Sequence, residues 1–192
     1  MADSRSVEQL QLAMQRLPGV GPKSAQRMAF YLLERDREGA YSIAEAIKSA
    51  LSKVNHCARC HNFSETEFCT ICASPRRDSR ILCIAETPAD VEAIEQASAY
   101  QGMYFVLMGH LSPLDGIGPE QLGISQMLEL VRSGSISEVI LATNLTLEGE
   151  STADYIADLL AEESLSVTRL ARGVPVGGEL EYMDAGTLNQ AF

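Results

Sequence analysis

Residues 57–72 read CARCHNFSETEFCTIC, and this stretch decides how the rest of the chain is interpreted. Its cysteines form two pairs, each with two residues between its members, and eight residues separate the pairs. Each pair can present two thiolates from one tight loop, and four sulfur ligands without an open position are typical of structural zinc. The sequence therefore predicts one zinc site, made by Cys57, Cys60, Cys69 and Cys72.

Other roles for this stretch are less favoured. Four unrelated buried cysteines would not explain two matched pairs, and redox chemistry would need only one pair. The loop holds little apolar material, so the metal must supply its folding energy, about 10–16 kcal/mol for structural zinc. His56 and His61 adjoin the cysteines and could replace one ligand, although solvated loop positions fit them better. Cys83 lies in a predicted strand and is expected in the core.

The charge of the chain divides unevenly between its two halves. The formal net charge is -11, but residues 1–80 hold 12 Lys and Arg against 9 Asp and Glu, whereas residues 81–192 hold 3 against 17. Only the first part, at +3, could approach phosphates, and the second, at -14, would repel them. One copy would bind DNA weakly, so several copies acting together would suit DNA binding better.

The first 55 residues are expected to be helical. Apolar residues recur at helical spacing before and after the run Pro18-Gly19-Val20-Gly21-Pro22, which indicates two helices joined by a tight hairpin. A third amphipathic helix is expected after Gly39, with Ser42 as its cap.

The hairpin between the first two helices suits an anion. Gly19 and Gly21 permit positive φ and close approach of an oxygen atom, and Pro22 fits the first helical position. The free N–H groups of the next turn then point outward at the positive end of the helix dipole. Lys23 and Arg27 are four residues apart, so both could reach a DNA backbone from one helix face. The alternative is a hairpin whose glycines only turn the chain.

From residue 80 onward the pattern changes to short apolar runs that alternate with helical stretches. The runs are rich in β-branched and aromatic residues, which is typical of strands. Strands that alternate with helices predict a mainly parallel sheet. The expected strands are 81–85, 104–108, 139–142 and 167–171, and the expected helices are 88–99, 119–132 and 152–163.

Acidic residues follow two of these strands. Ligands of open parallel sheets lie beyond the carboxyl ends of the strands, and there the chain has Glu86, Asn144, Glu148 and Glu150. Three carboxylates at one edge could hold Mg²⁺ through oxygen ligands. A solvated acidic rim, or a surface for a basic protein partner, is an equally weighted alternative. His110 and Asp115 lie in a Gly- and Pro-rich loop, where a turn role is expected.

The order of these motifs resembles the RecR family of bacterial recombination and repair factors. The resemblance is carried by the helix-hairpin-helix, the four cysteines, Pro75-Arg76-Arg77 and the runs 109–119 and 173–179, and it covers nearly the whole chain. It implies an α+β multi-module fold. The expected modules are a helix-hairpin-helix DNA-binding domain at 1–55, a four-cysteine zinc finger at 56–79, an α/β Toprim domain at 80–172 and a Gly-rich C-terminal segment at 173–192, a possible assembly element.

The resemblance also implies a function. RecR proteins act with RecO, and in some settings RecF, to load RecA onto single-stranded DNA, and they form ring-like oligomers, tetramers or dimers. A cytoplasmic, nucleoid-associated location follows, and the chain shows neither a leader nor an apolar run of the roughly 20 residues that span a bilayer.

The family contains a Toprim module that in other proteins is catalytic. Catalytic Toprim proteins carry a glutamate and an Asp-x-Asp pair, whereas this chain has Glu148-Gly149-Glu150, and no tyrosine stands out as a nucleophile. We therefore expect no enzymatic activity, with a Toprim nuclease, primase or topoisomerase-like enzyme as the alternative. Leu145 stands where the family usually has proline, and the sequence ends at Phe192, before the usual C-terminal tail.

Overall fold

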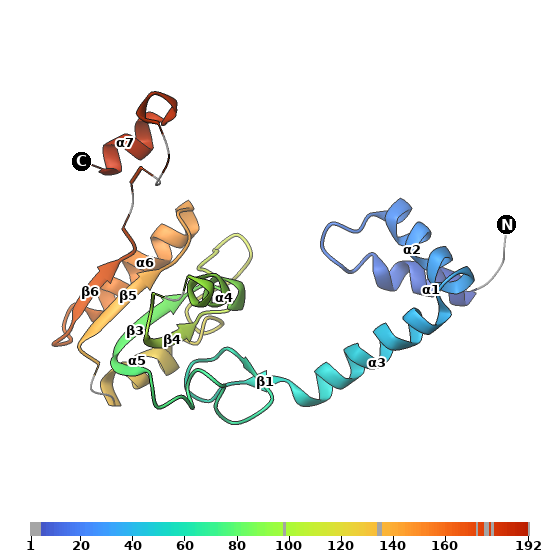
Figure 1. Ribbon diagram of the computed structural model, residues 1–192, viewed down its shortest axis with the longest axis horizontal. Coiled ribbons are helices and arrows are strands. Elements are labelled where there is room, and N and C mark those ends of the chain that lie inside the picture. Colours follow the sequence, from blue (N-terminus) through green and yellow to red (C-terminus); the bar gives the residue numbers. More distant parts are fainter. Residues whose placement is uncertain are drawn as a thin grey trace. The chain divides into compact units, whose positions relative to one another are not determined.

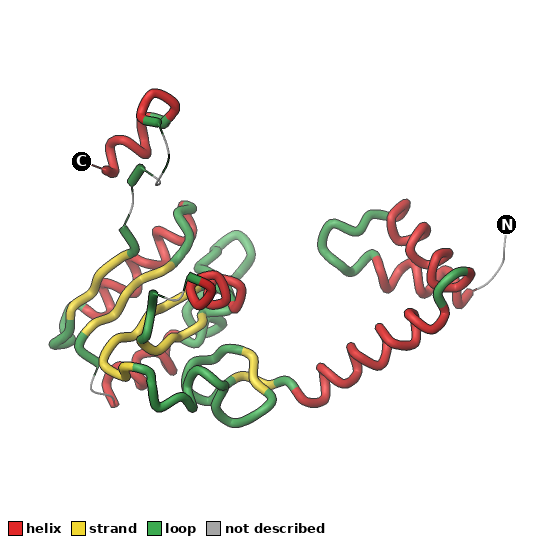
Figure 2. Tube along the Cα trace, viewed as in Figure 1, coloured by secondary structure: helices red, strands yellow, loops and turns green. Residues whose placement is uncertain are grey.

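The computed structural model describes residues 5–97, 99–133, 136–171, 173–174, 177 and 179–191 (Figure 1). The chain divides into two compact units, Met1–Val54 and Asn55–Phe192. The first unit is helical and the second is built around a parallel sheet (Figure 2). None of the described helices combines the length and the hydropathy that a bilayer crossing requires.

Three helices make the first unit: α1 (Arg5–Met14), α2 (Pro22–Glu34) and α3 (Arg37–Lys53). Helix α1 packs on α2, and α2 packs on α3. Ala25 and Ala29, on one side of α2, are fully buried, because their small side chains let the neighbouring helix approach closely. The other apolar residues of this unit, from Val7 to Val54, are at least partly exposed. Its core is therefore small for the apolar surface that it carries.

Helix α3 begins earlier than the sequence suggested. The expected cap at Ser42 is wrong, because Ser42 lies inside the helix. The carboxylate of Asp36 accepts a hydrogen bond from the Gly39 N–H at 2.8 Å, which satisfies one of the free donors of the first turn. Asp36 therefore starts α3 directly after α2, with almost no linker between the two helices.

The second unit contains the predicted parallel sheet. Its strand order is β4-β3-β5-β6, and every neighbouring pair is parallel. The mixture of helices, a four-cysteine module and an α/β sheet confirms the predicted fold class. The elements of the sheet layer are β3 (Asp78–Ala85), β4 (Gly102–Val106), β5 (Glu138–Ala142), β6 (Ser166–Arg169), α4 (Pro88–Gln96), α5 (Ile124–Ser133) and α6 (Leu147–Leu160).

Both faces of this sheet are covered by helices. Successive side chains of a strand point to opposite faces, and β3 shows this directly. Leu82 and Ile84 join the core formed with α5 and α6, whereas Cys83 and Ala85 join the core formed with Val91 of α4. Burial raises the pKa of the Cys83 thiol to about 12, so Cys83 is the core residue that the sequence predicted.

The start of α6 changes the setting of two predicted site residues. The sequence placed this helix at 152–163, but Thr146 caps a helix that begins at Leu147, with its hydroxyl accepting from the Gly149 N–H at 3.1 Å. Glu148 and Glu150 consequently lie in the first helical turn and not in a loop after β5. Carboxylates in a first turn are favoured by the helix dipole, so this position suits their negative charge.

Among its described residues, the Gly-rich C-terminal segment, which the sequence analysis gave as a possible assembly element, contains two short helices. They are η1 (Leu180–Tyr182) and α7 (Ala185–Ala191), and the Asp184 carboxylate accepts from the Thr187 N–H at 2.9 Å near the start of α7.

Candidate zinc site and nucleic-acid interface

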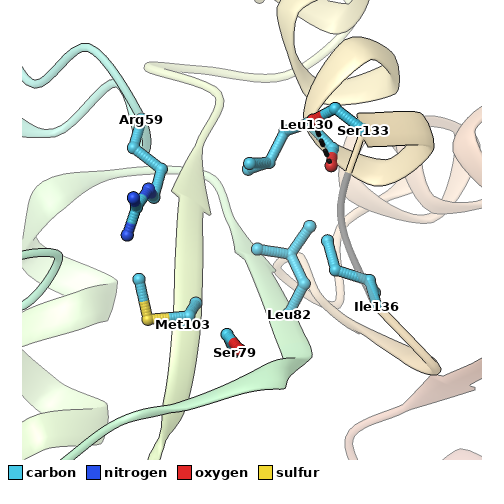
Figure 3. A pocket seen from close by; sticks show the side chains of 7 residues that line it. All are labelled: Arg59, Ser79, Leu82, Met103, Leu130, Ser133 and Ile136. Atoms are coloured by element: carbon cyan, nitrogen blue, oxygen red, sulfur yellow. Dashed lines mark hydrogen bonds between the residues drawn. The ribbon is translucent and has the colours of Figure 1, made fainter. Parts of the chain in front are cut away.

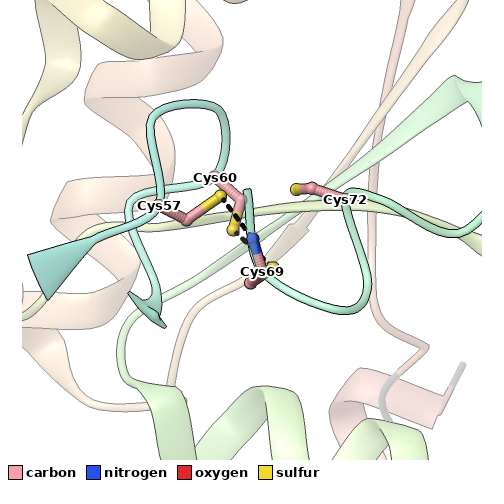
Figure 4. A group of neighbouring side chains, drawn as sticks. All are labelled: Cys57, Cys60, Cys69 and Cys72. Carbon is pink, nitrogen blue, oxygen red and sulfur yellow. Dashed lines mark hydrogen bonds between the residues drawn. The ribbon is translucent and has the colours of Figure 1, made fainter. Parts of the chain in front are cut away.

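The four cysteines of the paired motif meet at one point. Their Sγ atoms all lie within 4.8 Å of one another, all four residues are buried, and the Sγ atoms of Cys60 and Cys69 are 3.5 Å apart (Figure 4). A tetrahedral zinc ion with Zn–S bonds of about 2.3 Å would hold its sulfurs about 3.8 Å apart. The two-stranded pair β1 (Asn55–His56) and β2 (Phe63–Ser64) closes the loop that carries the first two cysteines. The donor set and its spacing therefore fit tetrahedral zinc.

The thiols of this cluster differ in acidity. The hydrogen bond from Cys72 lowers the pKa of the Cys60 thiol to about 5, while the same interaction and burial raise the pKa of Cys72. Burial also raises the pKa of Cys69. Since the thiolate is the form that binds metal, zinc binding here is coupled to the release of protons.

The two histidines beside the cysteines support the loop and do not join the sulfur group. His61 has a positive φ of 62°, and its Nδ1 lies 3.0 Å from the Val106 carbonyl oxygen. Its ring stacks between His56, at 4.4 Å, and Phe105, at 5.9 Å. His56 is exposed, as expected, but His61 is half-buried against the sheet and is not a solvated loop residue.

The cysteine module is attached to the sheet. The Val106 N–H donates to the Cys60 carbonyl at 2.9 Å, and the four cysteines belong to the core that α5 and α6 form with the sheet. Arg59 donates to the Cys72 carbonyl at 3.2 Å and lies over the Phe68 ring. Metal binding in this module is therefore linked to the stability of the sheet.

A hollow of about 290 Å³ opens beside Arg59 (Figure 3). Its polar groups are partly engaged, because Arg59 binds the Cys72 carbonyl and the Ser133 hydroxyl donates to the Leu130 carbonyl. Leu82 and Met103 make most of the rest apolar. Little remains in this hollow that could recognise a polar ligand.

Arg77, the last residue of Pro75-Arg76-Arg77, holds the end of the cysteine module against α4 and β4. Its guanidinium pairs with Glu95 at 2.9 Å and donates to the carbonyls of Tyr100 and Gly102. The Tyr104 hydroxyl also donates to Glu95, and Arg77 keeps the pKa of that carboxyl below its usual value. No sequence pattern indicated this pairing, which removes Arg77 from the charges available to DNA.

The predicted hairpin has an open backbone. Gly19 has φ +76°, which favours glycine, and Cβ atoms built at Gly19 and Gly21 would meet nothing within 4 Å. Gly21 caps α2 without a side-chain hydrogen bond, and Pro22 occupies the first turn. The hairpin thus presents bare backbone at the positive end of α2, the arrangement that binds phosphate oxygens.

Lys23 and Arg27 follow the hairpin on α2, and both side chains are exposed. Within the described residues neither forms a salt bridge with a carboxylate. The structure therefore leaves both charges available beside the open backbone, as DNA contacts would require, although the contacts themselves stay a prediction.

At the other predicted site, Glu86 is used inside the fold. This residue directly follows β3, and it is 2% exposed. It accepts hydrogen bonds from the backbone N–H of Asn144 at 2.8 Å and from the Asn144 side chain at 2.7 Å, and the His110 Nδ1 lies 3.4 Å away. A Cβ added at Gly149 would lie 2.2 Å from the Asn144 carbonyl oxygen and 2.6 Å from a Glu86 oxygen, so glycine is required at this point of α6. Glu86 therefore links the end of β3 to Asn144, which lies between β5 and the start of α6.

The other two acidic residues do not complete a group with Glu86. Glu150 lies 3.7 Å from Arg169, which also binds Asp154 at 2.6 Å, and Glu148 is exposed. Among the described residues, the four cysteines form the one cluster close enough to hold a metal ion. The predicted Mg²⁺ site thus gains no support from the positions of these carboxylates.

The loop that carries His110 and Asp115 is an ordered turn. Ser112 and Ile117 form a bridge, and the Ser112 hydroxyl donates to the Asp115 carboxylate at 2.6 Å. The backbone N–H of Leu111 donates to the Thr152 hydroxyl and fixes the loop to α6. Asp115 therefore takes part in the turn, as expected.

Comparison with known protein families gives one consistent match along the chain. Residues 7–51 match the RecR helix-hairpin-helix, 54–74 the RecR zinc finger domain with four cysteines, 80–171 a Toprim domain and 173–192 the RecR C-terminal region. The chain is 54% identical to the recombination protein RecR of Xanthomonas axonopodis pv. citri over 189 residues, 98% of this chain and 96% of the relative. It is 57% identical to RecR of Hydrogenovibrio crunogenus over 180 residues, 94% of this chain and 91% of the relative. With matches of this extent, the chain belongs to the RecR family of recombination proteins.

Proposed function

We propose that this RecR chain is a non-catalytic DNA-binding factor that acts with RecO, and with RecF in some settings, to load RecA onto single-stranded DNA. Family membership supports a role in recombinational repair. The observation that carries the DNA-binding part is the open hairpin at the start of α2, with two exposed cations beside it. A protein that works on bacterial DNA would be cytoplasmic and associated with the nucleoid.

Zinc is the proposed metal of the cysteine cluster, and its role is structural. Four buried thiolate ligands leave no open position for a substrate or an activated water molecule. Cys57, Cys60, Cys69 and Cys72 would hold the ion, which would order the loop between them.

The use of the acidic residues inside the fold favours a non-catalytic Toprim domain. Both oxygens of Glu86 accept hydrogen bonds from Asn144, and Glu150 lies near Arg169. Metal-dependent cleavage would require these carboxylates to exchange such partners for the ion. A Toprim nuclease, primase or topoisomerase-like enzyme is the alternative function.

An oligomer is proposed because one face of α3 carries apolar side chains that the described residues of its own helical unit leave exposed. Ile43, Ile47 and Leu51 are spaced four apart on α3, and they are 52%, 56% and 81% exposed. An apolar helix stripe without cover marks an interface. A ring-like tetramer or dimer would also bring several weakly basic helical units to one DNA molecule, and the combined contacts would bind far more tightly than one.

We expect light scattering to give a mass that is a multiple of 20.8 kDa. Leu51→Glu should shift that mass toward the monomer, because it would place a charge in the proposed interface. Leu145→Glu is the control, since Leu145 is 66% exposed and lies outside α3. A monomeric wild-type protein with full DNA binding would contradict the proposal.

The function itself is tested with the purified protein, RecO and RecA on single-stranded DNA that is covered by single-strand-binding protein. We expect DNA binding that weakens as salt rises, and faster RecA filament formation only when RecO is present. The same protein, incubated with DNA, nucleotides and Mg²⁺, should neither cut nor extend DNA. If the wild-type protein cleaves or extends DNA and Glu148→Gln abolishes this activity, the protein is an enzyme instead. If the wild-type protein retains no DNA at any salt concentration, it is a purely protein-binding adaptor.

A further inference from the structure

One face of α2 combines aromatic and basic side chains around an open hollow. The residues are spaced three or four apart, so they lie on one side of the helix. The hollow has a volume of about 450 Å³. Its lining consists of Lys23, Gln26, Arg27, Phe30, Tyr31, Glu34 and Arg35.

The two rings on this face are exposed. Phe30 is 48% exposed and Tyr31 is 53% exposed. Within the part of the chain that the structure describes, neither ring stacks on another aromatic side chain. By contrast, Phe68 has the Arg59 guanidinium over its face. Phe30 and Tyr31 therefore offer ring surface to an incoming group.

The cations around the rings are also available. Among the residues placed in the structure, no carboxylate lies within salt-bridge distance of Lys23, Arg27 or Arg35. Some other arginines of the chain do have such a partner, as Arg77 with Glu95 shows. The single acidic residue of the hollow is Glu34. The face therefore has a net positive charge directly beside exposed aromatic rings.

Single-stranded nucleic acid carries the two features that match this face. Its phosphates pair with cations, and its unpaired bases stack on aromatic rings, an interaction that tolerates any base because every base has a π-face. In a duplex these base faces are covered by their neighbours. We propose that α2 binds single-stranded DNA, with unpaired bases stacked on Phe30 and Tyr31 and phosphates held by Lys23, Arg27 and Arg35. The proposal rests on DNA binding by the hairpin and adds a preference for unpaired strands.

A second copy of the chain fits this face less well. In a two-fold contact the same patch of each copy meets, so the three cations of one copy would face those of the other. Like charges placed across an interface oppose association. The apolar stripe of α3, which carries Ile43 and Ile47, offers a copy an uncharged surface. Charge thus favours nucleic acid on the α2 face, and Arg27 and Tyr31 at its border also line a second, apolar hollow with Ile43 of α3.

The test uses full-length, zinc-loaded protein and three labelled probes of about 20 nucleotides: an oligo-dT strand, a duplex, and a strand of abasic sites that keeps the phosphates and lacks the bases. Tyr31→Leu and Phe30→Leu keep apolar bulk and remove the ring. Each should weaken oligo-dT binding about 5- to 50-fold and leave the other two probes unchanged. Tyr31→Phe should bind normally. Phe63→Leu is the matched control, because its ring is exposed and lies outside the hollow.

Each other outcome overturns a defined part of the proposal. Equal loss on the abasic strand, or no loss on oligo-dT, would rule out stacking. A lower mass in Tyr31→Leu with unchanged DNA binding would make the face an interface between copies. If Lys23→Ala weakens binding to all three probes while Tyr31→Leu has no effect, the hairpin function stands and only stacking fails. A wild-type protein that binds none of the probes would overturn both.

Discussion

Cys60→Ser should lose most of its bound zinc and destabilise the second unit by several kcal/mol. A complete structural site contributes about 10–16 kcal/mol at neutral pH, and removing one of four ligands leaves an incomplete tetrahedron. The effect should extend beyond the loop, because the Cys60 carbonyl accepts a hydrogen bond from Val106 at the end of β4. Zinc content and denaturant unfolding followed by circular dichroism would measure both changes.

Cys83→Ala provides the control for this substitution. Cys83 is equally buried but lies in β3, outside the sulfur cluster, so its loss should cost about 1–2 kcal/mol through poorer packing and leave the zinc content unchanged. A chelator should reproduce the Cys60→Ser result in the wild-type protein. Full stability of metal-free wild-type protein would show that the cluster does not need its metal.

Local sequence signals predicted the main elements of this chain. The cysteine spacing predicted a cluster whose sulfurs the structure brings together, and short apolar runs predicted the strands of the parallel sheet. The buried position of Cys83 followed from its place in one of these apolar runs. Such signals work because each depends on residues only a few positions apart along the chain.

Features that depend on distant residues were not predictable in the same way. Glu86 binds Asn144, which lies 58 positions later, and Arg77 binds Glu95 across 18 positions. Hydrophobic periodicity does not reveal such pairs. The carboxylates at the sheet edge therefore suggested a metal site, although one of them, Glu86, is hydrogen-bonded inside the fold. The start of α6 was missed for a smaller reason: Thr146 is a cap that the sequence interpretation overlooked, and the helix begins directly after it.

The hairpin and the acidic edge should respond to substitution in opposite directions. Lys23→Ala and Arg27→Ala should each weaken binding to every DNA sequence alike, because phosphate contacts carry no sequence information. For duplex DNA, each lost contact should reduce the salt slope by about 0.9 units. In an oligomer, each substitution is present in every subunit. One phosphate contact would then be lost for each helical unit bound to DNA, and the losses of affinity would multiply. Fluorescence anisotropy across a salt series measures the slope.

Lys48→Ala is the matched control for these two variants, since Lys48 is exposed on α3 and paired with Glu45 at 2.8 Å. It should leave the slope unchanged, and zinc content should be normal in all three proteins. If binding and slope also stay unchanged in Lys23→Ala and Arg27→Ala, the hairpin takes no part in DNA binding.

Glu148→Gln should leave DNA binding equal or slightly stronger, because removing a negative charge cannot reduce phosphate affinity unless a bridging metal is lost with it. Glu148 is exposed, so its substitution should not disturb the fold. The informative result is a Mg²⁺ dependence. Weaker binding in Glu148→Gln only when Mg²⁺ is present would mean that a metal joins the acidic edge to DNA, even though Glu86 and Glu150 have other partners in this structure. Equal binding with and without Mg²⁺ would leave the acidic edge free to contact a basic protein partner.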